Sequence, residues 1–175
     1  ITLYHLIWRG FRQRAYFQRW NERYASYPAV TAATPLWLHA VSVGEVNAAA
    51  PVVDALRKAH PEWRWLVTTI TPTGSARVQK LFGDRVFHVY LPYDLPGSVK
   101  RFLNRIRPRL GVVMETEIWP NLFYYCQMRK VPIVIANARL SERSLRGYGP
   151  VRPLARAAIR SAAYIAASSR QDAAR

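Results

Sequence analysis

The sequence predicts an α/β fold in which a parallel sheet carries helices on both faces. Short apolar segments rich in β-branched residues recur along the chain, and a helical pattern follows nearly every one of them. Half of the 175 residues are hydrophobic, which is enough for one domain with a packed core. Regular alternation of strand and helix is typical of a Rossmann-like domain.

The predicted elements follow one another in order after a proline-marked linker at residues 25–35. Strands are expected at residues 36–43, 64–70, 86–91, 110–114, 131–136 and 163–167. Helices are expected at residues 46–59, from the turn 71–74 to residue 81, from the loop 92–96 to residue 106, from residue 120 to 130, and near 151–161.

The first residues differ in character from the rest. Residues 3–24 mix Trp, Tyr and Phe with Arg at helical spacing, a pattern typical of an interfacial amphipathic helix. The apolar opening, residues 1–8, is too short to span a bilayer. We therefore expect residues 1–27 to form a basic aromatic, membrane-proximal helix and residues 28–175 to form the Rossmann-like domain. The alternative is a helix packed on the domain with its arginines in solvent.

The net charge of +16 predicts an anionic partner. The charge concentrates at the two ends: residues 1–30 carry five Arg against one Glu, and residues 139–175 carry eight Arg against two acids. Nucleic acid, a phosphorylated ligand and an anionic membrane surface all fit this balance. Because the chain begins at Ile1 and stops within a helical pattern, we expect it to be a piece of a longer protein.

Several function classes are excluded by what the sequence lacks. The single Cys126 excludes an internal disulfide and a cysteine-based zinc site, and the four histidines show no metal-ligand spacing. There is no dinucleotide fingerprint after the first strand, no P-loop and no nucleophile elbow. No helix-turn-helix, RNP or zinc-finger pattern supports nucleic-acid binding.

Glu45 lies where the first predicted strand passes into a helix, next to Ser42 and Gly44. In open α/β sheets ligands bind at this edge, and the positive end of a helix favours the ionised carboxylate. Glu45 is therefore a candidate general base. Ser42 and Glu45 also fit a capping box, in which both side chains only satisfy backbone groups of the helix. The two roles can coexist.

Four other loops should line the same edge, at residues 71–74, 92–94, 115–117 and 137–141. Thr71, Thr73 and Gly74 precede a helix and suit a phosphate, although a threonine cap with a turn glycine explains them as well. Glu115 and Glu117, if extended, point to one face and could bind a metal, share a proton or hold sugar hydroxyls. Their alternative role is capping ahead of Trp119-Pro120. The segment 139–143 is a charged rim for an anionic ligand, or solvated surface.

Taken together, these loops closely resemble the amino-terminal half of the 3-deoxy-D-manno-octulosonic acid (Kdo) transferases of Gram-negative lipopolysaccharide synthesis. Five sequence blocks carry the resemblance, in order along nearly the whole chain, at residues 37–45, 68–74, 88–94, 114–121 and 137–144. The resemblance implies a two-domain GT-B glycosyltransferase, of which this chain is the acceptor-side domain. The donor CMP-Kdo would be held mainly by a second domain, and the acceptor would be the lipid A precursor.

The resemblance also implies roles for single residues. Glu45 matches the family's general base, and Glu115 matches a second carboxylate that stabilises the transition state or orients the site. The remaining candidates for substrate binding are Ser42, Gly44, Thr71, Thr73, Gly74, Glu117, Arg139 and Ser141. The family implies no bound metal, no cofactor, and a location on the cytoplasmic face of the inner membrane.

The competing interpretation is a non-catalytic basic α/β module that binds nucleic acid or an anionic membrane. A nucleic-acid groove should be lined by Lys, Arg and stacked aromatic residues. The predicted loop edge instead carries Glu45, Asp94, Glu115 and Glu117. This acidic content favours a sugar site and argues against nucleic acid.

Overall fold

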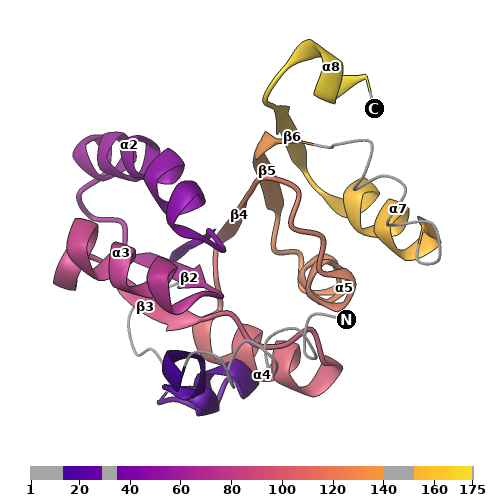
Figure 1. Cartoon of the computed structure of the whole chain (residues 1–175). Helices are drawn as coiled ribbons and strands as arrows, with labels where there is room; N and C mark the ends of the chain where they lie inside the picture. Colours follow the sequence, from indigo (N-terminus) through magenta and orange to yellow (C-terminus); the bar gives the residue numbers. More distant parts are fainter. Residues whose placement is uncertain (1–13, 29–34, 140–151, 175) are drawn as a thin grey trace.

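The computed structural model describes residues 14–28, 35–139 and 152–174, in which one six-stranded parallel sheet forms the centre (Figure 1). The strands pair in the order β3-β2-β1-β4-β5-β6. In chain order they are β1 (Leu36–His39), β2 (Trp65–Thr69), β3 (Phe87–Tyr90), β4 (Leu110–Met114), β5 (Ile133–Ala138) and β6 (Tyr164–Ala167). This is the doubly wound order of Rossmann domains, so the predicted fold class is confirmed.

Two layers of helices cover the sheet (Figure 1). One layer holds α2 (Val43–Ala59) and α3 (Pro72–Phe82), which pack against each other. The other holds α4 (Pro96–Ile106), α5 (Pro120–Met128) and α7 (Arg152–Ser161), with α5 between its two neighbours. The short helix α8 (Arg170–Ala173) and the 3-10 turns η1 (Arg14–Phe17), η2 (Trp20–Tyr24) and η3 (Gly83–Arg85) complete the described elements. None of the helices in the described part of the chain is long and apolar enough to cross a bilayer.

The central strand β1 is buried along its whole length, as expected for a strand covered on both faces. The side chains of one hydrophobic cluster lie under α2 and α3, and those of a second lie under α4 and α5. Gly111 of β4 is required by this packing, because a Cβ there would lie 2.5 Å from Ile133 Cδ1 and 2.8 Å from the Trp37 ring.

Helix α2 begins three residues earlier than predicted, at Val43. The strand predicted at residues 36–43 ends at His39 in the structure. Residues 40–43 of that apolar run form the loop and enter the first turn of α2. Apolar content cannot distinguish a buried strand from a buried helical turn. As a result Glu45 lies inside the first turn of α2, and not in a loop before the helix.

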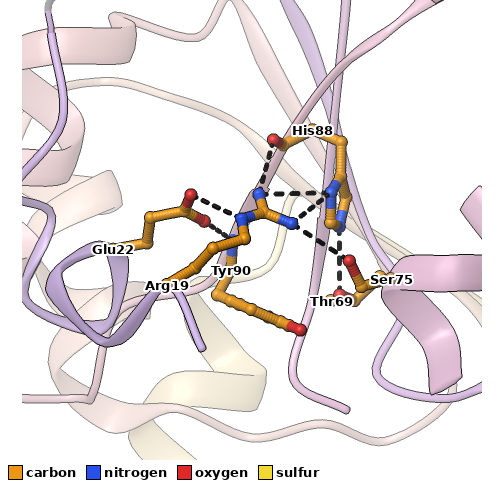
Figure 2. A network of polar contacts seen from close by, with 6 residues as sticks. All are labelled: Arg19, Glu22, Thr69, Ser75, His88 and Tyr90. Atoms are coloured by element: carbon orange, nitrogen blue, oxygen red, sulfur yellow. Dashed lines mark hydrogen bonds and ion pairs between the residues drawn. The ribbon is translucent and has the colours of Figure 1, made fainter. Parts of the chain in front are cut away.

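The N-terminal residues 14–27 do not form the continuous helix predicted for residues 3–24. They form two 3-10 turns that lie beside β3 and α4. Arg19 Nε donates to Glu22 Oε1 at 2.7 Å, and Glu22 Oε2 accepts from the Tyr90 backbone N–H at 2.9 Å (Figure 2). Residues 1–13 lie outside the described part of the chain, and the membrane role of residues 1–27 stays a prediction.

Arg19 also fixes the position of a partly buried histidine, His88. The guanidinium of Arg19 lies 3.3 Å from His88 Nδ1 and donates to Ser75 Oγ at 3.0 Å (Figure 2). Burial, and then the charge of Arg19, lowers the pKa of His88 to about 3. Because arginine can only donate, the neutral ring accepts at Nδ1 and its Nε2–H donates to Thr69 Oγ1, 3.1 Å away.

Arg23 is fully buried, contrary to the expectation that the arginines of this segment would be in solvent if it packed on the domain. Its Nη2 donates to the Ile70 carbonyl at 2.9 Å, and its guanidinium lies 4.4 Å from the centroid of the Tyr90 ring. Trp20 and Tyr24 pack edge-on against Tyr93. The N-terminal segment is therefore attached to the sheet by both charge and aromatic contacts.

Candidate functional site

The candidate site lies at the carboxyl ends of β1 and β4, the two strands at which the order of the sheet reverses. Helix α2 leaves β1 into one layer, and α5 follows β4 into the other. Such a switch point opens a crevice where ligands bind in doubly wound folds. Glu45 reaches it from α2, while Glu115 and Glu117 reach it from the loop between β4 and α5.

Glu45 is held by the loop that precedes its own helix. Its Oε2 accepts from the Val41 backbone N–H at 2.8 Å, and its Oε1 accepts from Ser42 Oγ at 2.9 Å. Ser42 is the N-cap of α2, but its hydroxyl does not bond a helical N–H. Glu45 reaches back as in a capping box, but its bond goes to the N–H of Val41, one residue before the N-cap, and the Ser42 half of the predicted box does not form. Both carboxylate oxygens consequently have fixed positions.

Burial changes the acidity of Glu45. The residue is 6% exposed, and burial raises the pKa of its carboxyl above the ordinary value. The hydrogen bonds from Val41 and Ser42 offset part of this, and the charge of Glu115 adds to it. The net direction is opposite to the one that the helix dipole alone predicts. A raised pKa makes the carboxylate a stronger base when it is ionised.

Glu117 is the second perturbed carboxyl of the site. Burial first, and the charge of Glu45 second, raise the pKa of Glu117 to about 7. The Trp119 side chain partly offsets this rise, and Glu115 adds a smaller one. The sequence predicted that Glu115 and Glu117 act together, and the structure adds Glu45 as a third carboxylate whose charge affects Glu117. When neighbouring carboxylates repel one another in this way, the group of acids as a whole keeps a proton to a higher pH than an isolated carboxyl would.

Glu115 is not extended, as the pairing argument had assumed. Its φ is 57°, in the left-handed region, and its backbone N–H donates to the Ala136 carbonyl at 2.8 Å. A left-handed conformation is unfavourable for a residue with a Cβ, and such residues concentrate at functional sites. The turn at Glu115 ends β4 and directs the following loop across the carboxyl edge.

A buried polar layer that the sequence analysis did not identify lies next to these carboxylates. His39, the last residue of β1, is fully buried, and its ring packs edge-on against Trp119 with centroids 6.1 Å apart. His39 Nδ1 lies 2.9 Å from Thr68 Oγ1. Burial lowers the pKa of His39 to about 4, so this histidine stays neutral. A polar residue closing an otherwise apolar strand was the only sequence feature that could have indicated it.

The structure assigns the Thr71 hydroxyl to backbone contacts. Thr71 Oγ1 accepts from Gly74 N at 3.0 Å as the N-cap of α3, and it also lies 3.2 Å from the Val41 carbonyl. Thr73 Oγ1 in turn lies 3.3 Å from Thr71 Oγ1. A Cβ on Gly74 would lie 2.9 Å from Thr71 Oγ1 and 3.0 Å from the Val41 carbonyl. The alternative role of these residues, a cap with a closely packed glycine, is therefore present, and phosphate binding stays a prediction.

Gly44 differs from Gly74 in having open space around it. The residue is exposed in the first turn of α2, and a Cβ there would meet only Ser42 Oγ at 3.9 Å. Neither its φ nor its described neighbours require glycine at this position. The absent side chain leaves the backbone beside Glu45 accessible from the crevice.

Arg139 lies at the same edge of the sheet, beyond β5. Its backbone N–H donates to Thr116 Oγ1 at 3.1 Å, and its Nε donates to Ser168 Oγ at 3.3 Å. Arg139 and Thr116 border a cavity of about 310 Å³, which Asp172 and apolar side chains such as Ile165 complete. Arg139 therefore connects the loops after β4, β5 and β6. Ser141, the last predicted substrate-binding residue, lies outside the described residues.

Metal binding was one of the roles considered for the paired glutamates. Within the described ranges, no group of three or more His, Cys, Asp and Glu side chains is arranged to hold a metal ion.

Asp94, the acidic residue in the loop after β3, has a structural role. Its carboxylate accepts from the backbone N–H groups of Asn121 and Leu122 at 3.0 and 2.8 Å, and so caps α5.

Comparison with known families identifies this arrangement. Residues 18–175 match the family model described as 3-deoxy-D-manno-octulosonic-acid transferase (kdotransferase). The chain belongs to the Kdo transferase family. The match covers all of the strands and the site loops, so the resemblance found in the sequence is confirmed.

Relatives in this family extend well beyond the chain. A 3-deoxy-D-manno-octulosonic acid transferase of Haemophilus influenzae is 51% identical over 139 residues, which are 78% of this chain and 33% of that protein. One from Bordetella pertussis is 40% identical over 90% of this chain and 37% of its own length. The chain thus spans about a third of the length of these curated relatives.

Solved structures give the fold independently of the Kdo transferase family. UDP-GlcNAc 2-epimerase from Neisseria meningitidis, bound to UDP-GlcNAc, superposes with a TM-score of 0.56 at 15% identity. The similarity covers 80% of this chain and 42% of the epimerase. It supports the GT-B-like architecture, and at this identity it supports nothing beyond the fold.

Proposed function

We propose that this chain is the acceptor-side domain of an enzyme that transfers Kdo from CMP-Kdo to the lipid A precursor in lipopolysaccharide synthesis. The observation that carries the proposal is the position of Glu45. It is buried and held by two hydrogen bonds at the switch point, beside two further carboxylates, in a chain of the Kdo transferase family. CMP-Kdo is held mainly by the second domain of the longer protein.

Glu45 acts as the general base in this proposal. Its carboxylate takes the proton from an acceptor sugar hydroxyl as that oxygen attacks the anomeric carbon of Kdo. The bond to CMP breaks, CMP leaves with the electron pair, and the anomeric centre inverts. The contacts from Val41 and Ser42 fix the carboxylate, and burial raises its basicity.

Glu115 and Glu117 have supporting roles. Glu115 projects from a left-handed turn at the end of β4 and orients the acceptor or stabilises positive charge that develops on the Kdo ring. Glu117, whose pKa is raised to about 7, can hold a proton at neutral pH. A protonated Glu117 reduces the repulsion that Glu45 would otherwise meet from a second anion.

The charge of the chain fits the proposed acceptor. The lipid A precursor carries two phosphates and lies in an anionic leaflet, and a net charge of +16 attracts both. The proposal therefore includes association with the cytoplasmic face of the inner membrane, and it includes neither a metal cofactor nor nucleic acid. Gly44, Thr73 and Arg139 remain candidates for contact with the acceptor sugar.

The direct test compares three forms of the full-length protein: wild type, Glu45→Gln and Glu62→Gln. Transfer of labelled Kdo from CMP-Kdo to the lipid A precursor is measured for each. Glu62 is an exposed acid whose described ion pair is with His60, so its variant controls for the change in charge. We expect Glu45→Gln to lose about a hundredfold or more of the activity, as general bases contribute.

Two other results would be informative. Normal activity of a folded Glu45→Gln variant would reject the general base and leave Glu45 its role in holding the loop before α2. Absence of transfer by the wild type, with donor and acceptor present, would reject the enzymatic proposal and favour a basic binding module.

A further inference from the structure

The two helix layers of the domain carry very different charges. None of the residues of α4, α5 and α7 is Asp or Glu. The opposite layer mixes signs, because Asp54 lies on α2 and Asp84 follows α3 directly in η3. Within the described structure, the helices of the α4–α5–α7 side of the sheet therefore carry positive charge with no acid to balance it.

Basic side chains project from the whole α4–α5–α7 layer. Eight of them lie on these helices or directly follow α5, and all except the partly buried Arg105 are exposed: Lys100, Arg101, Arg105, Arg129, Lys130, Arg152, Arg156 and Arg160. Among the described residues, none of the eight forms an ion pair with an acid. On α7 three arginines recur every four residues, so they share one face, and they border one open hollow.

Large apolar side chains are exposed among these cations. Tyr124 and Met128 of α5 are 53% and 65% exposed, and their spacing of four residues places them on one face. Leu154 of α7 is 57% exposed too, but it lies two residues from Arg152 and from Arg156 and does not share their face. Helix α7 packs against α5, so Tyr124, Met128 and the α7 arginines belong to one layer of helices.

The N-terminal segment joins the same layer at its other end. Arg101 Nε of α4 donates to the Tyr24 carbonyl at 3.0 Å, and the Arg105 guanidinium donates to the Ala25 carbonyl. The described part of the basic, aromatic segment, residues 14–27, is therefore attached beside α4 through η2. It extends the cationic layer, while Arg19 also reaches Ser75 of α3.

We infer that the outer face of the α4–α5–α7 layer docks on the surface of an anionic lipid bilayer. The arginines and lysines bind headgroup phosphates, and Tyr124 and Met128 enter the boundary between headgroups and acyl chains. Exposed Tyr and Met side chains gain free energy when they leave water for lipid, whereas a nucleic-acid backbone offers them no such burial. The inference rests on the proposed function only in naming the bilayer of the acceptor lipid.

The first test measures binding of the full-length protein to vesicles, without any sugar donor. Vesicles of phosphatidylcholine with phosphatidylglycerol are compared with pure phosphatidylcholine vesicles. The Arg152→Gln/Arg156→Gln/Arg160→Gln variant is matched with Arg57→Gln/Lys58→Gln/Lys80→Gln, which removes the same charge from the opposite layer. We expect about a fivefold loss for each arginine of α7, or about a hundredfold for the triple variant, and little loss for the control.

A second test reports which face meets the lipid. Cys126, the one cysteine of this chain, is buried, so a cysteine introduced on the surface can be labelled with a polarity-sensitive dye, with the protein lacking that cysteine as the blank. We expect a dye at Met128→Cys to shift to the blue on anionic vesicles. A dye at Val52→Cys, which is 51% exposed on α2, should not shift.

Several outcomes would overturn the inference. Equal losses in the two triple variants would mean that only net charge attracts the protein. A blue shift at Val52 and none at Met128 would place the lipid on the other layer. Binding of a DNA duplex that depends on the α7 arginines, while vesicle binding does not, would assign them to nucleic acid. Because no transfer is measured, an inactive enzyme that still binds vesicles through this face would reject only the proposed function.

Discussion

Glu115 follows the last residue of β4, Asn137 follows the register partner of that residue within β5, and both have a left-handed backbone. Their φ angles are 57° and 56°. Met114 pairs with Ala136, and the Glu115 N–H donates to the Ala136 carbonyl at 2.8 Å. Asparagine tolerates this conformation, but for glutamate it costs on the order of 1–2 kcal/mol. The carboxyl edge of the sheet therefore holds a strained turn at one of its three clustered acids.

Replacing Glu115 with glycine should separate strain from function. Glycine adopts a positive φ without a steric penalty but loses more backbone entropy on folding, so the two effects largely cancel. We expect Glu115→Gly to change the free energy of unfolding by less than about 1 kcal/mol and to lower Kdo transfer severely. Urea unfolding and the transfer assay measure the two effects. Full activity in the glycine variant would mean that the left-handed turn serves only the loop geometry.

The raised pKa of Glu117 should give the stability of the domain a definite pH dependence. In the unfolded chain Glu117 ionises near its ordinary value of 4.5, whereas in the fold it keeps its proton to about pH 7. The fold binds more protons on Glu117 between these values, so the contribution of Glu117 to stability is greatest below pH 4.5 and falls as the pH rises to 7. The raised pKa of Glu45 acts in the same direction. The lowered pKa values of His39 and His88 act in the opposite direction below pH 6.5, and both wild type and variant share them.

The glutamine variant tests this assignment. Glu117→Gln cannot ionise, so it should lose this part of the pH dependence and exceed the wild type in stability at pH 8 by on the order of 2 kcal/mol. Thermal unfolding from pH 5 to pH 8 measures the difference, with Glu62→Gln as an exposed control. A stability difference between wild type and Glu117→Gln that stays the same from pH 5 to pH 8 would contradict a protonated Glu117 in the fold.

Two glycines at the same edge should respond oppositely to alanine. In Gly74→Ala the new Cβ meets Thr71 Oγ1 at 2.9 Å and the Val41 carbonyl at 3.0 Å, so we expect a loss of about 1–3 kcal/mol. Gly44→Ala has no such contact and should gain about 0.5 kcal/mol from higher helix propensity. If the acceptor approaches α2 closely, Gly44→Ala should still raise the KM for the lipid. An unchanged KM would remove Gly44 from the binding site.

Local patterns in the sequence were sufficient for the sheet. The predicted strand 110–114 coincides with β4, because a strand buried on both faces is a short, continuous apolar run. The start of α2 was placed too late, since Val41 and Val43 continue that apolar pattern into the loop and the helix. The 3-10 turns near Arg19 depend on contacts with Ser75 and His88, which no local spacing reveals.

The candidate site was predicted in its location more than in its chemistry. Loops that follow parallel strands must meet at one edge, so the shared position of Glu45 and Glu117 could be deduced from element order. Their acidity could not, because burial opposes the helix dipole and only the packed structure gives its extent. The burial and neutral state of His39 could not be predicted for the same reason. Its ring contacts Thr68 and Trp119, which are both distant in the chain.

Glu22 should control how firmly the N-terminal turns are attached to the sheet. β3 is an edge strand, and the Glu22 carboxylate accepts from its Tyr90 N–H while also pairing with Arg19. Glutamine keeps the size of the side chain but loses both charge-assisted bonds, which contribute about 1–2 kcal/mol together. We expect trypsin to cleave Glu22→Gln after Arg19 about tenfold faster than wild type, with a small change in Tm, because the local opening equilibrium shifts.

The control variant Glu62→Gln should be cleaved at the same rate as the wild type. Unchanged cleavage of Glu22→Gln would mean that the buried Arg23 and the contacts of Trp20 and Tyr24 with Tyr93 hold the segment without the carboxylate.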